Sequence, residues 1–239
     1  MERNELVLAR LSNQYLLRTG ERMEVLRAMN GFQAQFLSNA LYAMRLRSTA
    51  YDTAHAADSL VKSWTLRGTM HIFAETDLPL FLHTGCRYRS RDWTVPSFWN
   101  QRPDWALTPQ RQAYFSDLIV DALAQGPMTR EALKARCRAA GMTQAEEGSI
   151  FHPWGGGIRE LCERGFLCGT VSEEKAFRLC PAFTPMEEQD ALLEQTRRYF
   201  TNYGPASIRD AAYYFGTSQA EIKKRLARLP VEAAKYEGQ

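Results

Sequence analysis

Ser63-Trp64-Thr65-Leu66-Arg67-Gly68-Thr69-Met70-His71-Ile72-Phe73 has the pattern of two short strands that pair about a turn at Gly68. The segments before it show the periodicity of amphipathic helices, at residues 5–17, 21–29, 34–46 and 54–62. Helices followed by a hairpin are the layout of a winged helix. We therefore assign residues 1–91 to a first winged-helix unit.

The same order of segments returns twice. Helical periodicity, then strand-like segments, occurs at residues 112–124, 129–140, 158–164, 165–171 and 176–180. A third copy has helical segments 192–203, 207–215 and 219–229 but a single strand-like segment, 231–236. The predicted fold class is mostly α with small β-hairpins (α+β), in tandem winged helix-turn-helix units: 1–91, 110–180 and an incomplete 189–239.

A short sequence motif that occurs twice supports the repeat. Gly126-Pro127 and Gly204-Pro205 each stand shortly before a hydroxyl residue, Thr129 or Ser207, that is suited to cap the next helix. Residues 92–109 form a connecting segment with little periodicity. We expect its tryptophans to pack onto the body of the protein: Trp93, Trp99 and Trp105.

Composition excludes several classes of protein. The five cysteines show neither CxxC pairing nor histidine partners, which argues against a disulfide framework or a zinc site, so we expect reduced, buried thiols. No run of eighteen apolar residues and no secretory leader occur. We expect a cytoplasmic, nucleoid-associated protein without membrane contacts, and no metal, cofactor or acyl-transfer triad is indicated.

Charge and fold together favour nucleic acid as the partner. The net charge is +3, with 13 Lys or Arg against 10 Asp or Glu in residues 1–110, and arginine outnumbers lysine 24 to 6. Guanidinium groups suit phosphate contacts, although a GC-rich genome explains the excess equally well. Winged helices present helices to the major groove, but they also serve as protein-interaction modules. Tandem units make a dimer unnecessary, so we expect a monomer on double-stranded DNA.

Two groups of basic residues are candidate phosphate contacts. Arg45 and Arg47, and likewise Arg87, Arg89 and Arg91, would lie on one side of an extended segment, whereas on a helix they would scatter. Lys223 and Lys224, with Arg225 and Arg228, suit a phosphate-facing helix, and a solvated helix face explains them equally well. Gly155-Gly156-Gly157 lacks the Gly-Lys-Ser/Thr of a phosphate loop and is interpreted as a turn.

Gln33 and Gln35 form a different kind of pair. On an extended backbone residues two apart point to one side, but on a helix they diverge, so joint action requires a non-helical turn. Gly31 makes such a turn plausible. Spacing alone favours the plainer alternative, two polar residues at the start of a helix.

Three stretches together resemble the AlkZ-like family: Gly31-Phe32-Gln33-Ala34-Gln35, Trp64 to His71, and Tyr203-Gly204-Pro205-Ala206-Ser207-Ile208-Arg209-Asp210. This family, which includes the AlkX or YcaQ enzymes, consists of winged-helix DNA glycosylases that excise bulky alkylated purines and unhook interstrand crosslinks. The resemblance implies that the chain grips duplex DNA and that Gln33 and Gln35 are catalytic. Branches of the family differ at the second position, and Gln35 indicates the Gln-x-Gln branch. Because family members usually continue into a further β-rich portion, we expect a short or truncated member.

The chemistry of the amides fits this assignment. Cleavage of an N-glycosidic bond passes through an oxocarbenium-like sugar, and enzymes acting on poor leaving groups use carboxylates. Neutral amides hold water and stabilise charge but do not titrate, so they suit cationic bases such as N7-alkylguanine, released by a monofunctional glycosylase. Arg67 and His71 are candidate DNA contacts; alternatively Arg67 pairs with an acid and His71 packs in the sheet. The main alternative function is a non-enzymatic winged-helix transcriptional regulator, and a second is a protein-binding scaffold.

Overall fold

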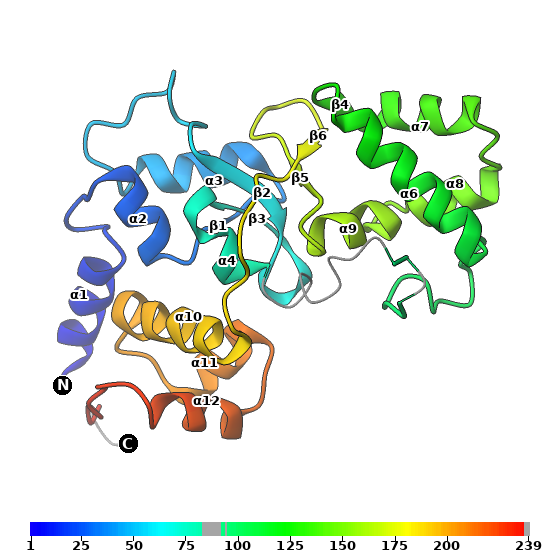
Figure 1. Ribbon diagram of the computed structural model, residues 1–239. Helices are drawn as coiled ribbons and strands as arrows, with labels where there is room; N and C mark the ends of the chain where they lie inside the picture. Colours follow the sequence, from blue (N-terminus) through cyan, green and yellow to red (C-terminus); the bar gives the residue numbers. More distant parts are fainter. Residues whose placement is uncertain (83–91, 94, 237–239) are drawn as a thin grey trace. The chain divides into compact units, whose positions relative to one another are not determined.

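The protein folds into two compact units in a computed structural model that describes residues 1–82, 92–93 and 95–236. The first unit contains Met1–Leu60, Thr65–Phe81 and Met186–Gln239, and the second contains Val61–Trp64 and Leu82–Pro185 (Figure 1). Segments far apart in the sequence therefore build the first unit. The division into three winged-helix units stays a prediction. Cys86, Arg87, Arg89 and Arg91 lie outside the described residues.

The first unit places helices around a short pair of strands. Its elements before the second unit are α1 (Arg3–Asn13), α2 (Arg22–Ala28), β1 (Phe32–Gln33), α3 (Leu37–Arg45), η1 (Leu66–Gly68), β3 (Met70–Ala74), η2 (Glu75–Asp77) and α4 (Leu78–Phe81). Those after it are α10 (Glu188–Tyr203), α11 (Ile208–Phe215) and α12 (Gln219–Leu226). Strands β1 and β3 pair antiparallel, which sets Phe32 opposite Ile72 and Gln33 opposite His71.

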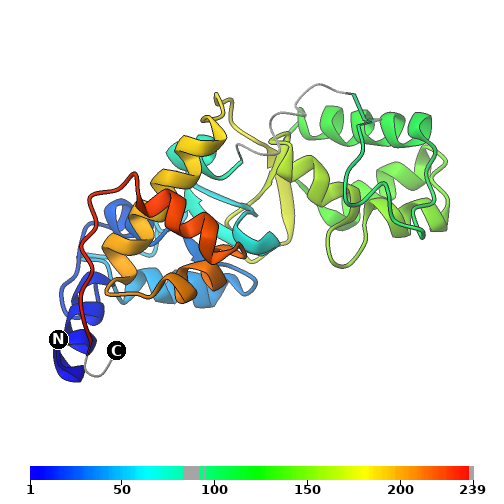
Figure 2. The same cartoon turned by 90° about the horizontal axis from the view of Figure 1, so that it is seen from below.

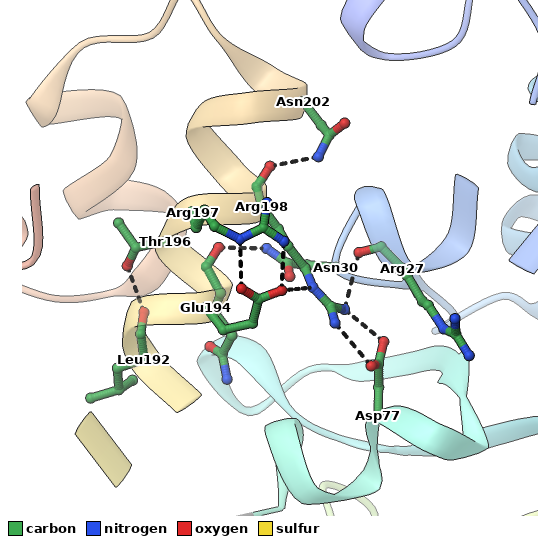
Figure 3. Close-up of polar contacts among 10 residues, drawn as sticks. Arg27, Asn30, Asp77, Leu192, Glu194, Thr196, Arg197, Arg198 and Asn202 are labelled. Atoms are coloured by element: carbon green, nitrogen blue, oxygen red, sulfur yellow. Dashed lines mark hydrogen bonds and ion pairs between the residues drawn. The ribbon is translucent and has the colours of Figure 1, made fainter. Parts of the chain in front are cut away.

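Helix α10 packs the C-terminal segment of the first unit onto its N-terminal segment, because it contacts α1, α2 and α4 as well as α12 (Figures 1 and 2). Figure 3 shows the polar contacts that fix it: the Arg198 guanidinium donates to both carboxylate oxygens of Asp77, at 2.7 and 3.0 Å. Arg198 also donates to Glu194 at 2.8 Å and to the Arg27 carbonyl at 3.2 Å. The buried Asn30 amide donates to the Gln195 carbonyl at 3.0 Å. Specific hydrogen bonds, and not apolar packing alone, therefore set the position of α10.

The second unit combines helices with an antiparallel set of strands. Its elements are β2 (Leu60–Trp64, of which Val61–Trp64 belong here), α6 (Pro109–Leu123), β4 (Met128–Thr129), α7 (Arg130–Ala139), α8 (Gln144–Ile150), α9 (Gly156–Glu163), β5 (Leu167–Gly169) and β6 (Ala176–Leu179). Strand β5 pairs with β2 and with β6, and β6 pairs with β4. Phe115, Ile119, Leu133 and Ile158 lie in its core and are almost fully buried.

All five tryptophans of the chain belong to the second unit. Trp93 is 2% exposed, its ring centroid lies 5.1 Å from that of Phe166, and its indole nitrogen donates to Asp117 at 3.3 Å. Trp99 is also buried, and Trp105 is partly buried against the same core. The expected packing of the tryptophans of segment 92–109 is thus confirmed. Tryptophan fluorescence therefore reports on the second unit.

Most predicted elements are confirmed, together with two predicted helix caps and the α+β class. Thr129 and Ser207 accept hydrogen bonds from the backbone N–H of Ala132 and Asp210 and so cap α7 and α11. Strands β2 and β3 lie on either side of Gly68, as predicted, and the Thr65 N–H donates to the Thr69 carbonyl across the turn at 3.1 Å. The described cysteines Cys137, Cys162, Cys168 and Cys180 form no disulfide with one another, and the first three are buried.

Several predicted elements are wrong. Residues 54–62 do not form a helix, because Ser59 has φ of +59° and the chain then enters strand β2. Tyr15, with φ of +59°, similarly prevents the first helix from reaching residue 17. Residues 231–236 form no strand and are all exposed, without a partner strand among the described residues. Helix α8 was not predicted, although Thr143 and Glu146 form a capping box, which is a sequence signal for the start of a helix.

Glu146 is expected to make the second unit sensitive to acid. Its buried carboxylate accepts two hydrogen bonds from Arg111, at 2.6 and 2.7 Å, and the Thr143 N–H at 2.8 Å, and the bonds from Arg111 lower its pKa from 4.5 to about 2. A lowered pKa in the folded state gives stability that is present above pH 4.5 and lost as the pH falls toward about 2. In the parent, the urea concentration at the midpoint of unfolding, followed by tryptophan fluorescence, should decrease as the pH is lowered from 4.5 to about 2.

The matched variant removes the titrating group. Glu146→Gln should lower the midpoint at pH 7 and flatten its dependence on pH between 5 and 2, whereas Glu174→Gln, at an exposed carboxylate, should leave the parent's profile unchanged. An unchanged slope in Glu146→Gln would show that another group causes the acid sensitivity.

Candidate functional site

A tight turn connects α2 to strand β1, where Gln33 lies. Asn30 and Gly31 follow α2 with φ of +56° and +77°, and the Gly31 N–H donates to the Leu26 carbonyl at 2.8 Å. A Cβ atom at Gly31 would lie 2.5 Å from the Ile72 carbonyl oxygen, which is closer than any real side chain tolerates. Position 31 therefore requires glycine for its conformation and for the close approach of β3.

Gln33 lies in strand β1 and Gln35 in the bend between β1 and α3, so neither lies on a helix. Phe32 and Ala34 are buried, whereas Gln33 and Gln35 are exposed, and the Ala34 N–H donates to the Met70 carbonyl at 2.7 Å. The alternation of burial exposes both amides while the residues between and before them face the core, as joint action of the two glutamines requires. Helix α3 begins only at Leu37. Within the described part of the chain, neither side-chain amide is held by a hydrogen bond, so both are available to a bound molecule.

His71 lies directly across the ladder from Gln33 but is buried, with 6% of its surface exposed. Its Nδ1 donates to the Thr69 carbonyl at 3.0 Å, which leaves Nε2 as an acceptor. Burial lowers the pKa of His71, with a smaller contribution from the positive charge of Arg67. The burial of His71 therefore favours the alternative interpretation, in which its ring packs in the sheet, over a direct contact with DNA.

Arg45 and Arg47 do not share one side of an extended segment, so that part of the prediction is wrong. Arg45 is exposed in the last turn of α3, whereas Arg47 follows the helix and is half-buried. The Arg47 guanidinium donates to the Gln14 and Ala43 carbonyls, at 3.0 and 2.9 Å, and lies 5.6 Å from the centroid of the Phe32 ring. Arg47 thus packs on a residue of the buried side of the strand, away from the two exposed amides.

Arg67 stands at the tip of the turn between β2 and β3, with φ of +53°. No ion pair of Arg67 with a described acidic residue is present, and its guanidinium carbon lies 5.8 Å from the ring centroid of Tyr213 and 5.9 Å from that of Tyr214. Arg67 and Tyr213, together with Arg209 and Gly216, border a cavity on the first unit. Sequence reasoning missed Tyr213 and Arg209; the available signal was an aromatic residue on the polar face of the predicted helix 207–215.

The helix α12 carries the remaining basic candidates. Lys223 and Lys224 are exposed, and Lys224 lies 3.8 Å from Glu221. Arg225 is 9% exposed and packs over the Phe215 ring, so it does not belong to the predicted phosphate-facing set. Arg228 lies 3.6 Å from Asp190.

In the second unit, the arginines of the predicted helix 158–164 form ion pairs. Arg159 pairs with Glu163 within α9, and Arg164, which follows the helix, pairs with Glu160. A Cβ atom at Gly156 would clash with the Ser149 carbonyl oxygen, so a tight turn explains the glycine run. The described residues contain no group of His, Cys, Asp and Glu that could hold a metal ion and no helix long and apolar enough to cross a membrane.

The family model described as DNA glycosylase AlkZ-like matches residues 26–238, which include both glutamines and the Arg67 turn. The chain belongs to the AlkZ-like family. It is 29% identical over 202 residues to the interstrand DNA cross-link repair glycosylase of Streptomyces sahachiroi, covering 77% of this chain and 52% of that protein. The chain thus spans about half the length of this curated relative.

The AlkZ-like assignment extends to the fold. The solved structure of the Streptomyces sahachiroi DNA glycosylase AlkZ superposes with a TM-score of 0.72 at 24% identity, covering 99% of this chain and 67% of that one. At this identity the likeness establishes the common fold. Both results agree with the mixed α+β architecture described above, helical with short antiparallel strands.

Proposed function

We propose that this AlkZ-like protein is a monofunctional DNA glycosylase that excises cationic alkylpurines of the N7-alkylguanine type from double-stranded DNA, with interstrand crosslinks as a second substrate class. The observation that carries the proposal is the pair of exposed amides of Gln33, at the end of strand β1, and Gln35, in the bend that follows it; neither is held by a hydrogen bond from a described residue. Family membership supports a role in DNA repair. The protein would act as a monomer near the nucleoid.

In this mechanism the substrate's own charge supplies most of the leaving-group activation. Alkylation at N7 makes guanine cationic, so it departs as a neutral base when the bond from C1′ to N9 breaks. The amide oxygens of Gln33 and Gln35 face the positive charge that develops on the sugar and accept hydrogen bonds from the attacking water. The C1′–O bond forms as that water releases a proton to solvent, which leaves an abasic site.

The amides also set a limit on the substrates. An amide cannot protonate a leaving base, because it does not titrate in the physiological range. Neutral adducts and undamaged bases should therefore remain intact. Arg67, Arg45, Lys223 and Lys224 would contact the phosphates, and three winged-helix segments (1–91, 110–180 and 189–239) would follow the duplex.

The test uses a duplex that carries one N7-methylguanine. The protein should release the free base and leave an abasic site that alkali cleaves, with no strand break before alkali. The same duplex with O6-methylguanine, a neutral adduct of similar size, should stay intact. Absence of release from a folded protein that binds the duplex would instead favour a DNA-binding regulator.

A further inference from the structure

A cavity on the first unit lies between the Arg67 turn and the helices α11 and α12. It is an open surface depression of about 630 Å³, bordered by Arg67, Arg209, Ala212, Tyr213, Gly216 and Gln219, among others. Cavities of several hundred Å³ are of the size that holds small ligands and single nucleotides. Its lining residues are distant in sequence from Gln33 and Gln35, and only Arg67 among them is a candidate DNA contact from the sequence.

Arg67 is presented to this cavity by a rigid support. The Gly68 N–H donates to the Thr65 carbonyl at 3.0 Å, and the Thr69 hydroxyl donates to the Leu66 carbonyl at 3.0 Å, which closes the turn around Arg67. Gly216 ends α11 with φ of +63°, and a Cβ atom there would lie 3.4 Å from Arg67 Cγ. The stem of Arg67 is thus packed while its guanidinium faces the cavity.

The cavity carries two positive charges and borders no acidic side chain. Among the described residues no carboxylate forms an ion pair with Arg67 or Arg209. The acid next in sequence to Arg209, Asp210, instead accepts the Ser207 N–H at 3.2 Å and lies 3.9 Å from Arg10. Two guanidinium groups without a carboxylate partner favour an anionic ligand, and the planar guanidinium matches phosphate oxygens.

Tyr213 adds a flat aromatic surface beside these charges. It is 79% exposed, whereas its neighbour Ala212 is 8% exposed and belongs to the core around α11. An exposed aromatic ring beside cationic groups is the combination on which proteins stack the bases of a nucleic acid strand. The fold does not require this ring, since most of its surface meets solvent.

We propose that this cavity binds one nucleotide of the DNA, with its phosphate on Arg67 and Arg209 and its base or sugar face on Tyr213. The proposal rests on the proposed function in that DNA is the partner. The turn that presents Arg67 continues directly into β3, whose His71 lies opposite Gln33. A nucleotide held here fixes the strand relative to the glutamine pair, independently of the base to be removed.

The test measures binding and not base release. Dissociation constants for an undamaged duplex with a short single-stranded overhang, whose unpaired bases are available for stacking, are determined by fluorescence anisotropy over a series of salt concentrations. The proteins compared are the parent, Tyr213→Ala, Tyr213→Phe and Arg209→Ala. Tyr213→Ala should weaken binding by roughly 5-fold to 150-fold, the equivalent of about 1–3 kcal/mol for one stacked base. Tyr213→Phe keeps the ring and should bind like the parent. Arg209→Ala should reduce the slope of log affinity against log salt by about 0.9.

Matched controls lie at exposed positions away from the cavity. Tyr114→Ala and Arg3→Ala should leave both the affinity and the salt slope at the parent's values. Parent-like affinity in Tyr213→Ala, an equal loss in Tyr213→Phe, or an unchanged slope in Arg209→Ala would each overturn the proposal. Failure of the proposed function has a different signature, namely normal DNA binding by the parent without release of N7-methylguanine.

Discussion

Replacing Gln33 or Gln35 with alanine is expected to slow the release of N7-methylguanine by about 100-fold to 1000-fold, the effect of removing one preorganised group that stabilises transition-state charge. Both side chains are exposed and make no hydrogen bond to another described residue, so the variants should unfold at the parent's temperature. Single-turnover release from a duplex with one lesion, at saturating protein, measures the chemical step without interference from binding.

The controls for this prediction separate chemistry from binding. Gln101→Ala changes another exposed glutamine and should release the base at the parent's rate. Gln33→Ala and Gln35→Ala should keep the parent's affinity for the lesion duplex, because neutral amides contribute little to phosphate binding. If either variant released the base as fast as the parent, that residue would have no catalytic role.

The largest expected effect on stability comes from Asp77→Ala in the first unit. The substitution removes a carboxylate that accepts two hydrogen bonds from Arg198, whose side chain is 13% exposed. Because Glu194 and the Arg27 carbonyl still accept hydrogen bonds from Arg198, its charge keeps partners, and the loss should be about 1–3 kcal/mol, the cost of the hydrogen bonds left unmade. Unfolding followed by far-UV circular dichroism should show this loss as a lower urea midpoint.

A double-mutant cycle identifies the cause of that loss. Arg198→Met removes the charge as well, so Asp77→Ala combined with Arg198→Met should lose much less stability than the sum of the single variants. The exposed pair of Asp190 and Arg228 is the matched comparison, because Asp190→Ala should barely change the midpoint. Additive losses at Asp77 and Arg198 would mean that the two side chains contribute separately.

The sequence was informative where a local rule sufficed. Thr129 and Ser207 were recognised as caps because a hydroxyl before a helical segment bonds its first turn. Gly31 was consistent with the turn before Gln33, but periodicity wrongly started the next helix at residue 34, whereas α3 begins at Leu37. Local rules failed at Ser59 and Tyr15, where side chains that normally avoid positive φ are held there by the surrounding structure.

Long-range contacts were beyond the reach of sequence patterns. Asp77 and Arg198 are 121 residues apart, and no local periodicity connects them. The burial of His71 and of Arg225 follows from such tertiary packing, which is why two residues assigned to DNA contact lie inside the fold. Tyr213 was overlooked for the opposite reason, since an aromatic residue in a helix is ordinarily assigned to the core.

The construction of the first unit from two separated segments has a consequence for how the chain is made. Residues 61–64 and 82–185 leave the ribosome before α10, so the second unit can complete its fold while the first still lacks the helix that holds it together. Synthesis from residue 81 to residue 203 takes roughly 6–24 s at about 5–20 residues per second. During that interval the strand with Gln33 and Gln35 belongs to a partly folded nascent chain. The two glutamines proposed to act on the base are therefore synthesised well before the helix that supports their unit.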